Sequence, residues 1–218
     1  MTDINKIVAI LKKETKSMTT PIVTALAKEH NNETAFKVLI STILSLRTKD
    51  EVTKEASLRL FATAKTAQEI LKLKASTIAK LIYPVGFYKT KAQNILSVCQ
   101  TLIEKYQNQV PQDLDALTEF KGVGRKTANL VLSLGWGLPA ICVDTHVHRI
   151  LNRIGYVKTK MPDETESVLR RILPKKHWII INDLLVMYGQ NLCRPISPFC
   201  SKCKIKPYCK QIGVTSKR

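Results

Sequence analysis

The sequence predicts an all-α protein, and three observations lead to this fold class. Apolar residues recur at helical spacing over several long segments. No segment repeats the strict alternation of apolar and polar residues that would build a sheet. The 8 glycines and 9 prolines lie mostly between the periodic segments. With 218 residues, 44% of them hydrophobic, the chain is long enough for one large or two modest domains with a real core.

Three of the expected helices come first along the chain. Residues 36–46 are nearly all apolar, which is typical of a buried helix. Residues 66–81 have a periodic apolar face and predict an amphipathic helix. Residues 92–106 predict another, whose apolar face consists of Ile95, Cys99, Leu102, Ile103 and Tyr106.

Two further helices are expected in the C-terminal part. Residues 164–173 repeat the amphipathic pattern. Trp178–Ile181 could pass for a short strand, but the run continues through Asn182-Asp183 into more apolar residues. This continuation favours a buried helix that ends at Gly189.

The charge balance predicts a polyanionic partner. The formal net charge is +18 and the sequence pI is about 9.8. Lysine and arginine displace counterions from a phosphate backbone, so nucleic acid is a natural partner. Ribosomal proteins and membrane-surface proteins are also basic, and charge alone does not separate these classes.

Compartment signals indicate a reducing cytoplasm. The first residues resemble neither a secretory signal nor a transit peptide, and no apolar run approaches transmembrane length. Cys99 and Cys142 lie inside apolar runs and are interpreted as small buried hydrophobic residues. We therefore expect no membrane partner.

Four cysteines near the C-terminus have the most informative spacing in the chain. Cys193, Cys200, Cys203 and Cys209 form the pattern C-x6-C-x2-C-x5-C, and no acidic residue follows the first of them. Four thiolates can hold an Fe–S cluster or a tetrahedral zinc ion, although the first gap is wider than zinc-ribbon spacing. A disulfide or a chance cluster is disfavoured, because the chain has no secretory features. The basic loop would suit a phosphate-facing surface.

Residues 119–129, EFKGVGRKTAN, predict a helix–hairpin–helix. The turn and the residues directly behind it are Gly122, Val123, Gly124, Arg125 and Lys126. Glycines permit a tight turn with unblocked amides, and a helix N-terminus offers N–H groups to an anion. Such a module grips a DNA phosphate without reading sequence; the alternative is an ordinary glycine-rich turn. Lys126 could be a phosphate contact, or a nucleophile if desolvation and the positive helix end remove its proton.

Asp144 follows the apolar run 140–143 at the expected start of a helix. An aspartate there is ordinarily an N-cap, but its second oxygen could serve chemistry if it faces a cleft. His146 and His148 lie two residues apart, so on a helix they point in different directions and are not expected to share a metal.

Three motifs in register resemble the endonuclease III family of helix–hairpin–helix DNA glycosylases. They are LTEFKGVGRKTANLVL, VDTHVHRILNR and the four-cysteine pattern, and the resemblance covers nearly the whole chain from about Phe36. It implies a six-helix barrel over 28–138, with the helix–hairpin–helix near 114–134. It also implies a discontinuous iron–sulfur domain over 1–27 and 139–218, with the cluster loop at 193–209 and a DNA-binding cleft between the domains.

The resemblance also implies the activity. The expected protein is a prokaryotic, DNA-associated monomer that removes damaged pyrimidines from duplex DNA, flipping the base out of the stack, and that also acts at abasic sites. Lys126 would attack C1′ and form a Schiff base that permits strand cleavage, and Asp144 would stabilise positive charge on the sugar. The four cysteines would hold a [4Fe–4S] cluster with a structural role.

The family pattern assigns the remaining candidate DNA contacts. They are Gly122, Val123, Gly124, Arg125, Thr145, His146, Lys202 and Lys204. Phe87 would be an apolar wedge in the duplex, with a core phenylalanine as the alternative. Lys91 would touch phosphate or simply be solvated. Arg47 stands where many relatives have glutamine and would favour lesions opposite guanine, unless it only contacts phosphate.

Phe120 and Lys121 also depart from the family, which often has Leu-Pro before the hairpin. Three rival functions stay open at this point. They are a monofunctional mismatch or uracil glycosylase of the same fold, an iron–sulfur electron-transfer protein and a non-catalytic DNA-binding module. Lys126 disfavours the first, and a basic surface with a glycine hairpin disfavours the second.

Overall fold

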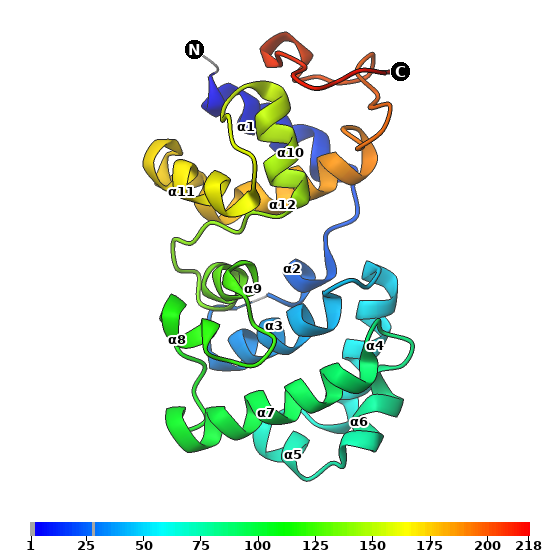
Figure 1. Cartoon of the computed structure of the whole chain (residues 1–218), viewed down its shortest axis with the longest axis vertical. Coiled ribbons are helices and arrows are strands. Elements are labelled where there is room, and N and C mark those ends of the chain that lie inside the picture. Colours follow the sequence, from blue (N-terminus) through cyan, green and yellow to red (C-terminus); the bar gives the residue numbers. More distant parts are fainter. Residues whose placement is uncertain (1–2, 28) are drawn as a thin grey trace. The chain divides into compact units, whose positions relative to one another are not determined.

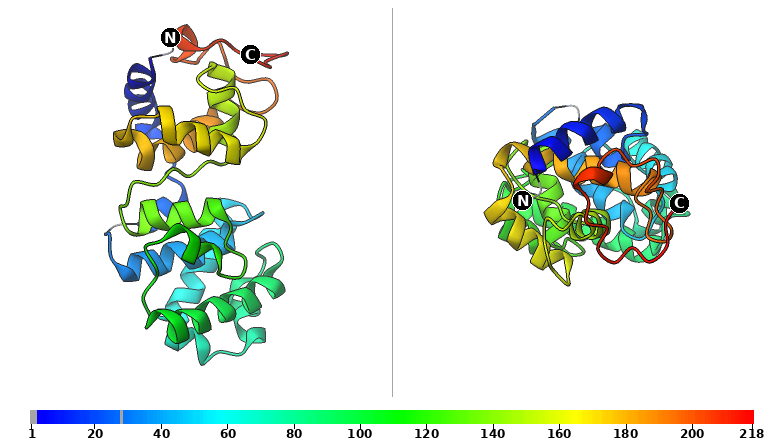
Figure 2. Two further views of the ribbon diagram at one scale, coloured as in Figure 1. Left: turned by 60° about the vertical axis from the view of Figure 1, so that its left-hand side comes forward. Right: turned by 90° about the horizontal axis from the view of Figure 1, so that it is seen from above.

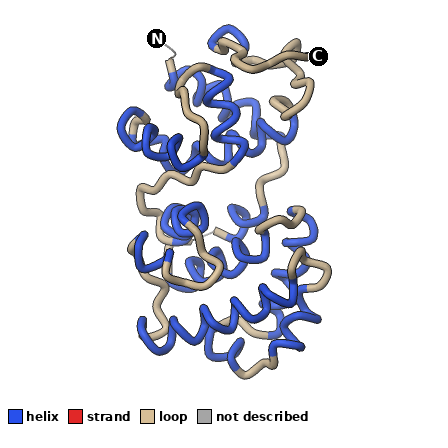
Figure 3. The backbone as a smooth tube through the Cα atoms, in the orientation of Figure 1, coloured by secondary structure: helices blue, strands red, loops and turns tan. Residues whose placement is uncertain are grey.

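The computed structural model describes residues 3–27 and 29–218, and every regular element within them is helical (Figures 1 and 3). This confirms the predicted all-α class. The chain divides into two compact units. The central unit is Ile22–Leu138, and the terminal unit joins Met1–Pro21 to Pro139–Arg218. Among the described residues, no helix combines the length and the apolar character needed to cross a membrane.

The first boundary differs from the expected one. We predicted that the terminal domain would extend to residue 27, but α2 (Ile22–Leu26) belongs to the central unit. The reason is packing, because α2 contacts α3 and α4 of that unit. The central unit ends at Leu138.

The described part of the central unit contains eight α-helices, several of them only five residues long. After α2 they are α3 (Asn32–Ser45), α4 (Asp50–Thr63), α5 (Ala67–Leu71), α6 (Ala75–Ile82), α7 (Tyr88–Tyr106), α8 (Leu114–Thr118) and α9 (Arg125–Leu130), which continues into the π-helical turn η2 (Val131–Gly135). From Thr34 to Leu44 α3 is buried except at Lys37, and it contacts α2, α4, α7, α9 and η2. A helix that is buried on nearly all sides lies at the centre of its unit.

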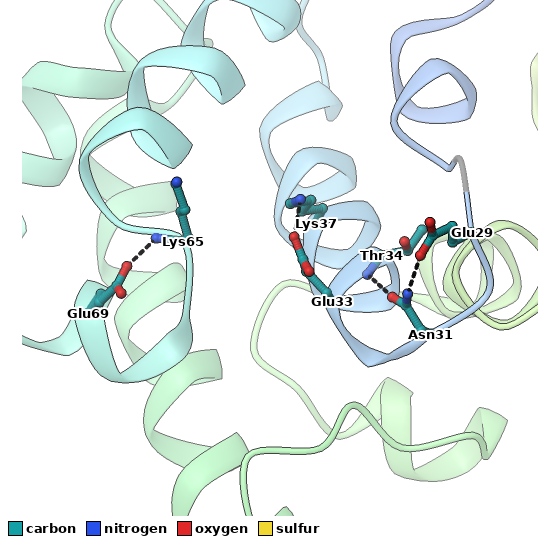
Figure 4. A network of polar contacts seen from close by, with 7 residues as sticks. All are labelled: Glu29, Asn31, Glu33, Thr34, Lys37, Lys65 and Glu69. Atoms are coloured by element: carbon teal, nitrogen blue, oxygen red, sulfur yellow. Dashed lines mark hydrogen bonds and ion pairs between the residues drawn. The ribbon is translucent and has the colours of Figure 1, made fainter.

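One predicted helix is two helices. Residues 66–81 form α5 and α6, separated at 72–74, where Lys74 has an extended backbone. The apolar periodicity survives the break because Ile70 and Ile78 are both fully buried and both helices pack on α7. Side-chain hydrogen bonds fix where α5 begins, because the Thr66 hydroxyl accepts a hydrogen bond from the amide of Glu69. The Glu69 carboxylate in turn accepts one from the amide of Lys65 (Figure 4).

The N-terminal helix of the chain packs with the C-terminal segment. The terminal unit contains α1 (Ile4–Glu14), α10 (Thr145–Ile154), α11 (Pro162–Ile172) and α12 (Trp178–Asn191), with the short turns η1 (Thr15–Ser17), η3 (Lys175–His177) and η4 (Lys206–Tyr208). α1 contacts α12, and the two lie side by side in Figure 2. The apolar face of α1 shares one core with α10 and α12. This shared burial explains why a helix so distant in sequence completes the unit.

α12 confirms the helical interpretation of Trp178–Ile181 but runs past its predicted end. It continues through Gly189 to Asn191. A Cβ at Gly189 would collide with the imidazole of His146 on α10. The glycine therefore permits the close approach of two helices and is not a terminator.

Candidate active site

The hairpin between α8 and α9 has the tight geometry expected of a glycine turn. Gly122 has φ +83°, and a Cβ there would lie 2.7 Å from the amide nitrogen of the Asn94 side chain. The amide of Val123 donates to Phe120 at 2.9 Å, and Val123 is buried. Gly124 caps α9, and a Cβ there would meet open space. Within the described chain, the amides of Gly122 and Gly124 have no acceptor, so both are available to an anion.

Phe120 packs the start of the hairpin against the core. Its side chain is buried, and its ring meets Tyr106 edge-to-face with centroids 5.5 Å apart. The neighbouring Lys121 is exposed. This departure from the family pattern thus keeps the hairpin packed while adding a positive charge.

Lys126 is the second residue of α9, directly behind the hairpin, and it is exposed. The desolvation expected from the sequence is therefore not supplied by the described residues, which corrects that part of the prediction. Lys126 does lie in the first turn of α9.

The position of Lys91 contradicts both predictions for this residue, a phosphate contact and a solvated side chain. It is only 6% exposed, and burial lowers its pKa to about 8. Its ammonium donates to the carbonyls of Leu44 (2.7 Å) and Leu46 (2.5 Å) and to Thr48 Oγ1 (3.2 Å). Leu44 lies in the last turn of α3 and Leu46 is its C-cap, where helix carbonyls lack partners.

Phe87 and Arg47 are both exposed and close together. Phe87 is 63% exposed, which excludes the alternative that it is a core phenylalanine. The Arg47 guanidinium lies 5.7 Å from the centre of its ring. Both residues have left-handed backbones, with φ 54° and 57°, a conformation that costs a non-glycine residue about 1 kcal/mol.

Asp144 caps α10 with one oxygen only. Its Oδ1 accepts the amides of His146 and Val147, both at 2.9 Å. Oδ2 accepts no hydrogen bond from the described residues, so one carboxylate oxygen is available for other chemistry. Lys126 belongs to the central unit and Asp144 to the terminal unit.

The other predicted contacts in the terminal unit differ in availability. Thr145, Lys202 and Lys204 are exposed. His146 is half-buried, with its Nδ1 3.2 Å from Arg149 Nη2. His148 instead meets Thr165 at 2.7 Å, so the two histidines face different neighbours.

The four spaced cysteines line one cavity, whereas Cys99 and Cys142 are buried elsewhere as predicted. The other walls of this cavity are largely apolar and include Ile150, Ile154 and Phe199. Burial raises the pKa of Cys203 and Cys209, so their thiolates need a compensating cation. Among the described residues, no three Cys, His, Asp or Glu side chains converge closely enough to share one metal ion. Four thiolates can hold an Fe–S cluster or a tetrahedral zinc ion.

Two arginines that the motifs did not single out tie α10 to the cysteine loop. Arg149 donates to the carbonyl of Cys193 at 2.8 Å. Arg153 is largely buried and donates to the carbonyls of Arg194 (2.7 Å) and Pro195 (2.6 Å). Their spacing of four residues, which puts both on one face of α10, was the available signal. Tyr188, fully buried, donates to Cys203 Sγ at 3.2 Å and gave no such signal.

Comparison of the sequence with known proteins points to one family. A model described as the HhH-GPD superfamily of base excision DNA repair proteins matches residues 40–175, more than half of the chain. Endonuclease III from Thermotoga maritima is 46% identical over 189 residues, covering 87% of this chain and 89% of that protein. Endonuclease III from Rickettsia conorii is 37% identical over 206 residues, covering 94% of each.

Solved structures agree with the sequence comparison. A non-covalent endonuclease III–DNA complex matches with a TM-score of 0.82 and 32% identity, covering 95% of this chain and 94% of that chain. A trapped endonuclease III–DNA covalent intermediate, an estranged-adenine complex, matches with the same values. A thermostable thymine-DNA glycosylase has a TM-score of 0.82 at 24% identity, which shows a shared fold only.

Proposed function

This chain belongs to the endonuclease III family of base excision repair DNA glycosylases, and we propose that it removes damaged pyrimidines and then cuts the strand through an imine on Lys126. The observation that carries the proposal is the placement of Lys126. This exposed amine lies directly behind a hairpin whose glycine amides are free to bind a phosphate. A phosphate held there would bring the neighbouring sugar within reach of the amine.

The proposed reaction proceeds in two stages. The neutral amine of Lys126 attacks C1′, the N-glycosidic bond breaks, and the base leaves with the bonding electron pair and takes up a proton. Opening of the sugar at O4′ then gives the imine between Nζ and C1′. Loss of a proton from C2′ breaks the C3′–O3′ bond, which cuts the strand 3′ to the lesion. Water hydrolyses the imine and restores the free lysine.

Asp144 is proposed to act with Lys126 on the same nucleotide. Its Oδ1 is engaged with the start of α10, and its unpartnered Oδ2 would stabilise positive charge on the sugar and accept the lysine proton. The proposal requires the bound DNA to meet both units at once.

We assign the cysteine cavity to a [4Fe–4S] cluster held by Cys193, Cys200, Cys203 and Cys209. The four-thiolate donor set fits a cluster, and the C-x6-C-x2-C-x5-C spacing, whose first gap is wider than in zinc ribbons, supports this assignment over zinc. When bound, the cluster supplies cross-linking and no step of the reaction. The exposed Lys202 and Lys204 on the same loop would then contact the DNA backbone.

Recognition of the lesion is assigned to exposed residues of the central unit. Phe87 would fill the space that the flipped base leaves, and Arg47 would face the orphaned partner base. Duplex DNA with a weakly paired, damaged pyrimidine or an abasic site is thus the proposed substrate of a monomeric enzyme.

Borohydride trapping on a duplex with one oxidised pyrimidine tests the proposed function. The wild-type protein should yield a covalent protein–DNA adduct, because borohydride reduces the imine to a stable amine. An alkali-labile abasic site without an adduct would instead identify a monofunctional glycosylase. No excision of any lesion, despite DNA binding, would favour a non-catalytic module.

Replacing Asp144 with asparagine separates its two roles. Asparagine caps a helix about as well as aspartate, so the melting temperature should change by no more than about 2 °C. Base removal should slow by at least about 100-fold, because the carboxylate charge is lost. Single-turnover kinetics at saturating protein measure this step.

Asp3→Asn is the matched control for Asp144→Asn. Asp3 caps α1 through the same pair of amides, two and three residues ahead. Its variant should keep the wild-type rate. Full activity of Asp144→Asn would show that Asp144 is only a cap.

Arg47 should make the enzyme faster on lesions opposite guanine than opposite adenine. An arginine that bonds guanine O6 and N7 discriminates by about tenfold or more. Arg47→Gln should bring the two excision rates close together, measured on duplexes that differ only in the opposite base. Equal rates in the wild type, unchanged by the substitution, would leave Arg47 as a phosphate contact.

A further inference from the structure

Two loops of the central unit are joined although they are distant in sequence. They are residues 46–49, between α3 and α4, and residues 83–87, between α6 and α7, and we call them the paired loops. The amide of Gly86 donates to Thr48 Oγ1 at 3.2 Å. A Cβ at Gly86 would lie 2.7 Å from the carbonyl oxygen of Arg47, so the two backbones touch and only glycine fits.

Each paired loop presents one bulky, exposed residue from a strained backbone. Arg47 has φ 54° and Phe87 has φ 57°. Residues other than glycine persist in this region only where surrounding contacts hold them, and such strain is typical of functional sites. The guanidinium of Arg47 lies over the ring of Phe87, so the two side chains lie side by side.

Lys91 is the residue that contacts both paired loops. Its ammonium donates its three N–H groups to Leu44, Leu46 and Thr48, and these hydrogen bonds stabilise the first paired loop. Its backbone amide donates to the carbonyl of Phe87 at 3.0 Å, which links it to the second loop. The Thr48 hydroxyl joins these contacts, because it accepts from both Lys91 and Gly86.

Burying this lysine is costly and no carboxylate compensates for it. Within the described residues Lys91 forms no ion pair, and burial lowers its pKa to about 8. Its ammonium is stabilised only by hydrogen bonds to carbonyl and hydroxyl oxygens. These lie at the C-terminal end of α3, where the helix dipole favours a cation. A methionine would fill the same space without a charge to bury, so packing alone does not explain a lysine here.

We propose that Lys91 is a positioning residue that fixes Arg47 and Phe87 as one preassembled pair, ready to enter the duplex at a lesion. The inference rests on the proposed function and adds a residue that does not touch DNA. Because the pair is already ordered, binding does not incur the entropy cost of ordering the two loops. The pair should therefore raise the affinity of the protein mainly for DNA in which a base is missing. Phosphate binding by the hairpin should not depend on it.

The test compares affinity for two duplexes of the same sequence, one intact and one with a tetrahydrofuran abasic-site analogue. The wild type should prefer the abasic duplex, and Lys91→Met should reduce that preference by about tenfold while affinity for intact duplex stays within about twofold. Lys105→Met removes the same charge from an exposed site on the same helix and should keep the wild-type preference.

A double-mutant cycle distinguishes positioning from general damage. If Lys91 acts through Phe87, then Lys91→Met should change the preference by less than about twofold in a Phe87→Ala background. Additive effects, or an equal loss of affinity for both duplexes, would overturn the inference. Thr48→Val removes the shared hydroxyl and supports the same cycle if Lys91→Met does not fold.

Base excision by the wild type keeps the two proposals separate. Excision of an oxidised pyrimidine together with normal abasic preference in both Lys91→Met and Thr48→Val would sink the inference and leave the function standing. If the wild type prefers the abasic duplex but excises no base, the proposed function is wrong. The affinity of Lys91→Met for abasic relative to intact duplex would still test the inference.

Discussion

Lys126→Gln should bind lesion DNA yet form no borohydride adduct. Glutamine keeps most of the side-chain length and polarity but has no amine to attack C1′, so both base removal through the imine and strand cleavage are lost. We expect the single-turnover rate of strand cleavage to fall at least about 10³-fold. Denaturing gels of the trapped complex and of the cleaved strand measure both effects on one substrate.

Lys121→Gln is the charge-matched comparison for this experiment. Lys121 is another exposed lysine of the same hairpin, five residues before Lys126. Its loss should at most weaken binding, and the adduct should still form at saturating protein. An adduct of undiminished yield from Lys126→Gln would assign the imine to another amine and refute the proposed nucleophile.

Cys203→Ala should empty the cysteine cavity and destabilise the terminal unit. Cys203 lines the cavity with the three other spaced cysteines, and its sulfur accepts a hydrogen bond from the fully buried Tyr188. Four thiolates bound to one centre make cluster binding part of the folding free energy of the unit. We expect loss of bound iron and sulfide and a melting temperature lower by at least about 10 °C.

The effect of Cys203→Ala should be local to the terminal unit. Hydrogen exchange should rise in residues 193–209 and in the end of α12, while α3 and α7 of the central unit keep their protection. The cysteine loop is bonded to α10 through Arg149 and Arg153, so α10 should also loosen.

Cys99→Ala supplies the control for the loss of a cysteine. Cys99 is fully buried in α7, and burial raises its pKa to about 12, so its thiol does not serve as a thiolate ligand. Its variant should cost about 1 kcal/mol of unfolding free energy and retain all iron. One zinc per wild-type chain, with no iron or sulfide, would replace the cluster assignment by a tetrahedral zinc site.

Features that depend on short stretches of sequence were predicted from the sequence. The all-α class followed from helical periodicity, and the family followed from three motifs in register. Trp178–Ile181 was assigned to a helix because the apolar run continued, and Cys99 and Cys142 were placed in the core. Each of these depends on spacing and on turn residues within a few helical turns.

Features that depend on which elements meet were decided only by the tertiary structure. Nothing local separates a buried Lys91 from a solvated one, because its burial requires the end of α3 to lie beside the start of α7. Gly189 resembles a helix terminator until α10 is packed against it. Likewise, residues 66–81 keep one periodicity across two helices, because α7 buries both. Periodicity records which face is buried, whereas the identity of the neighbour on that face is set by long-range packing.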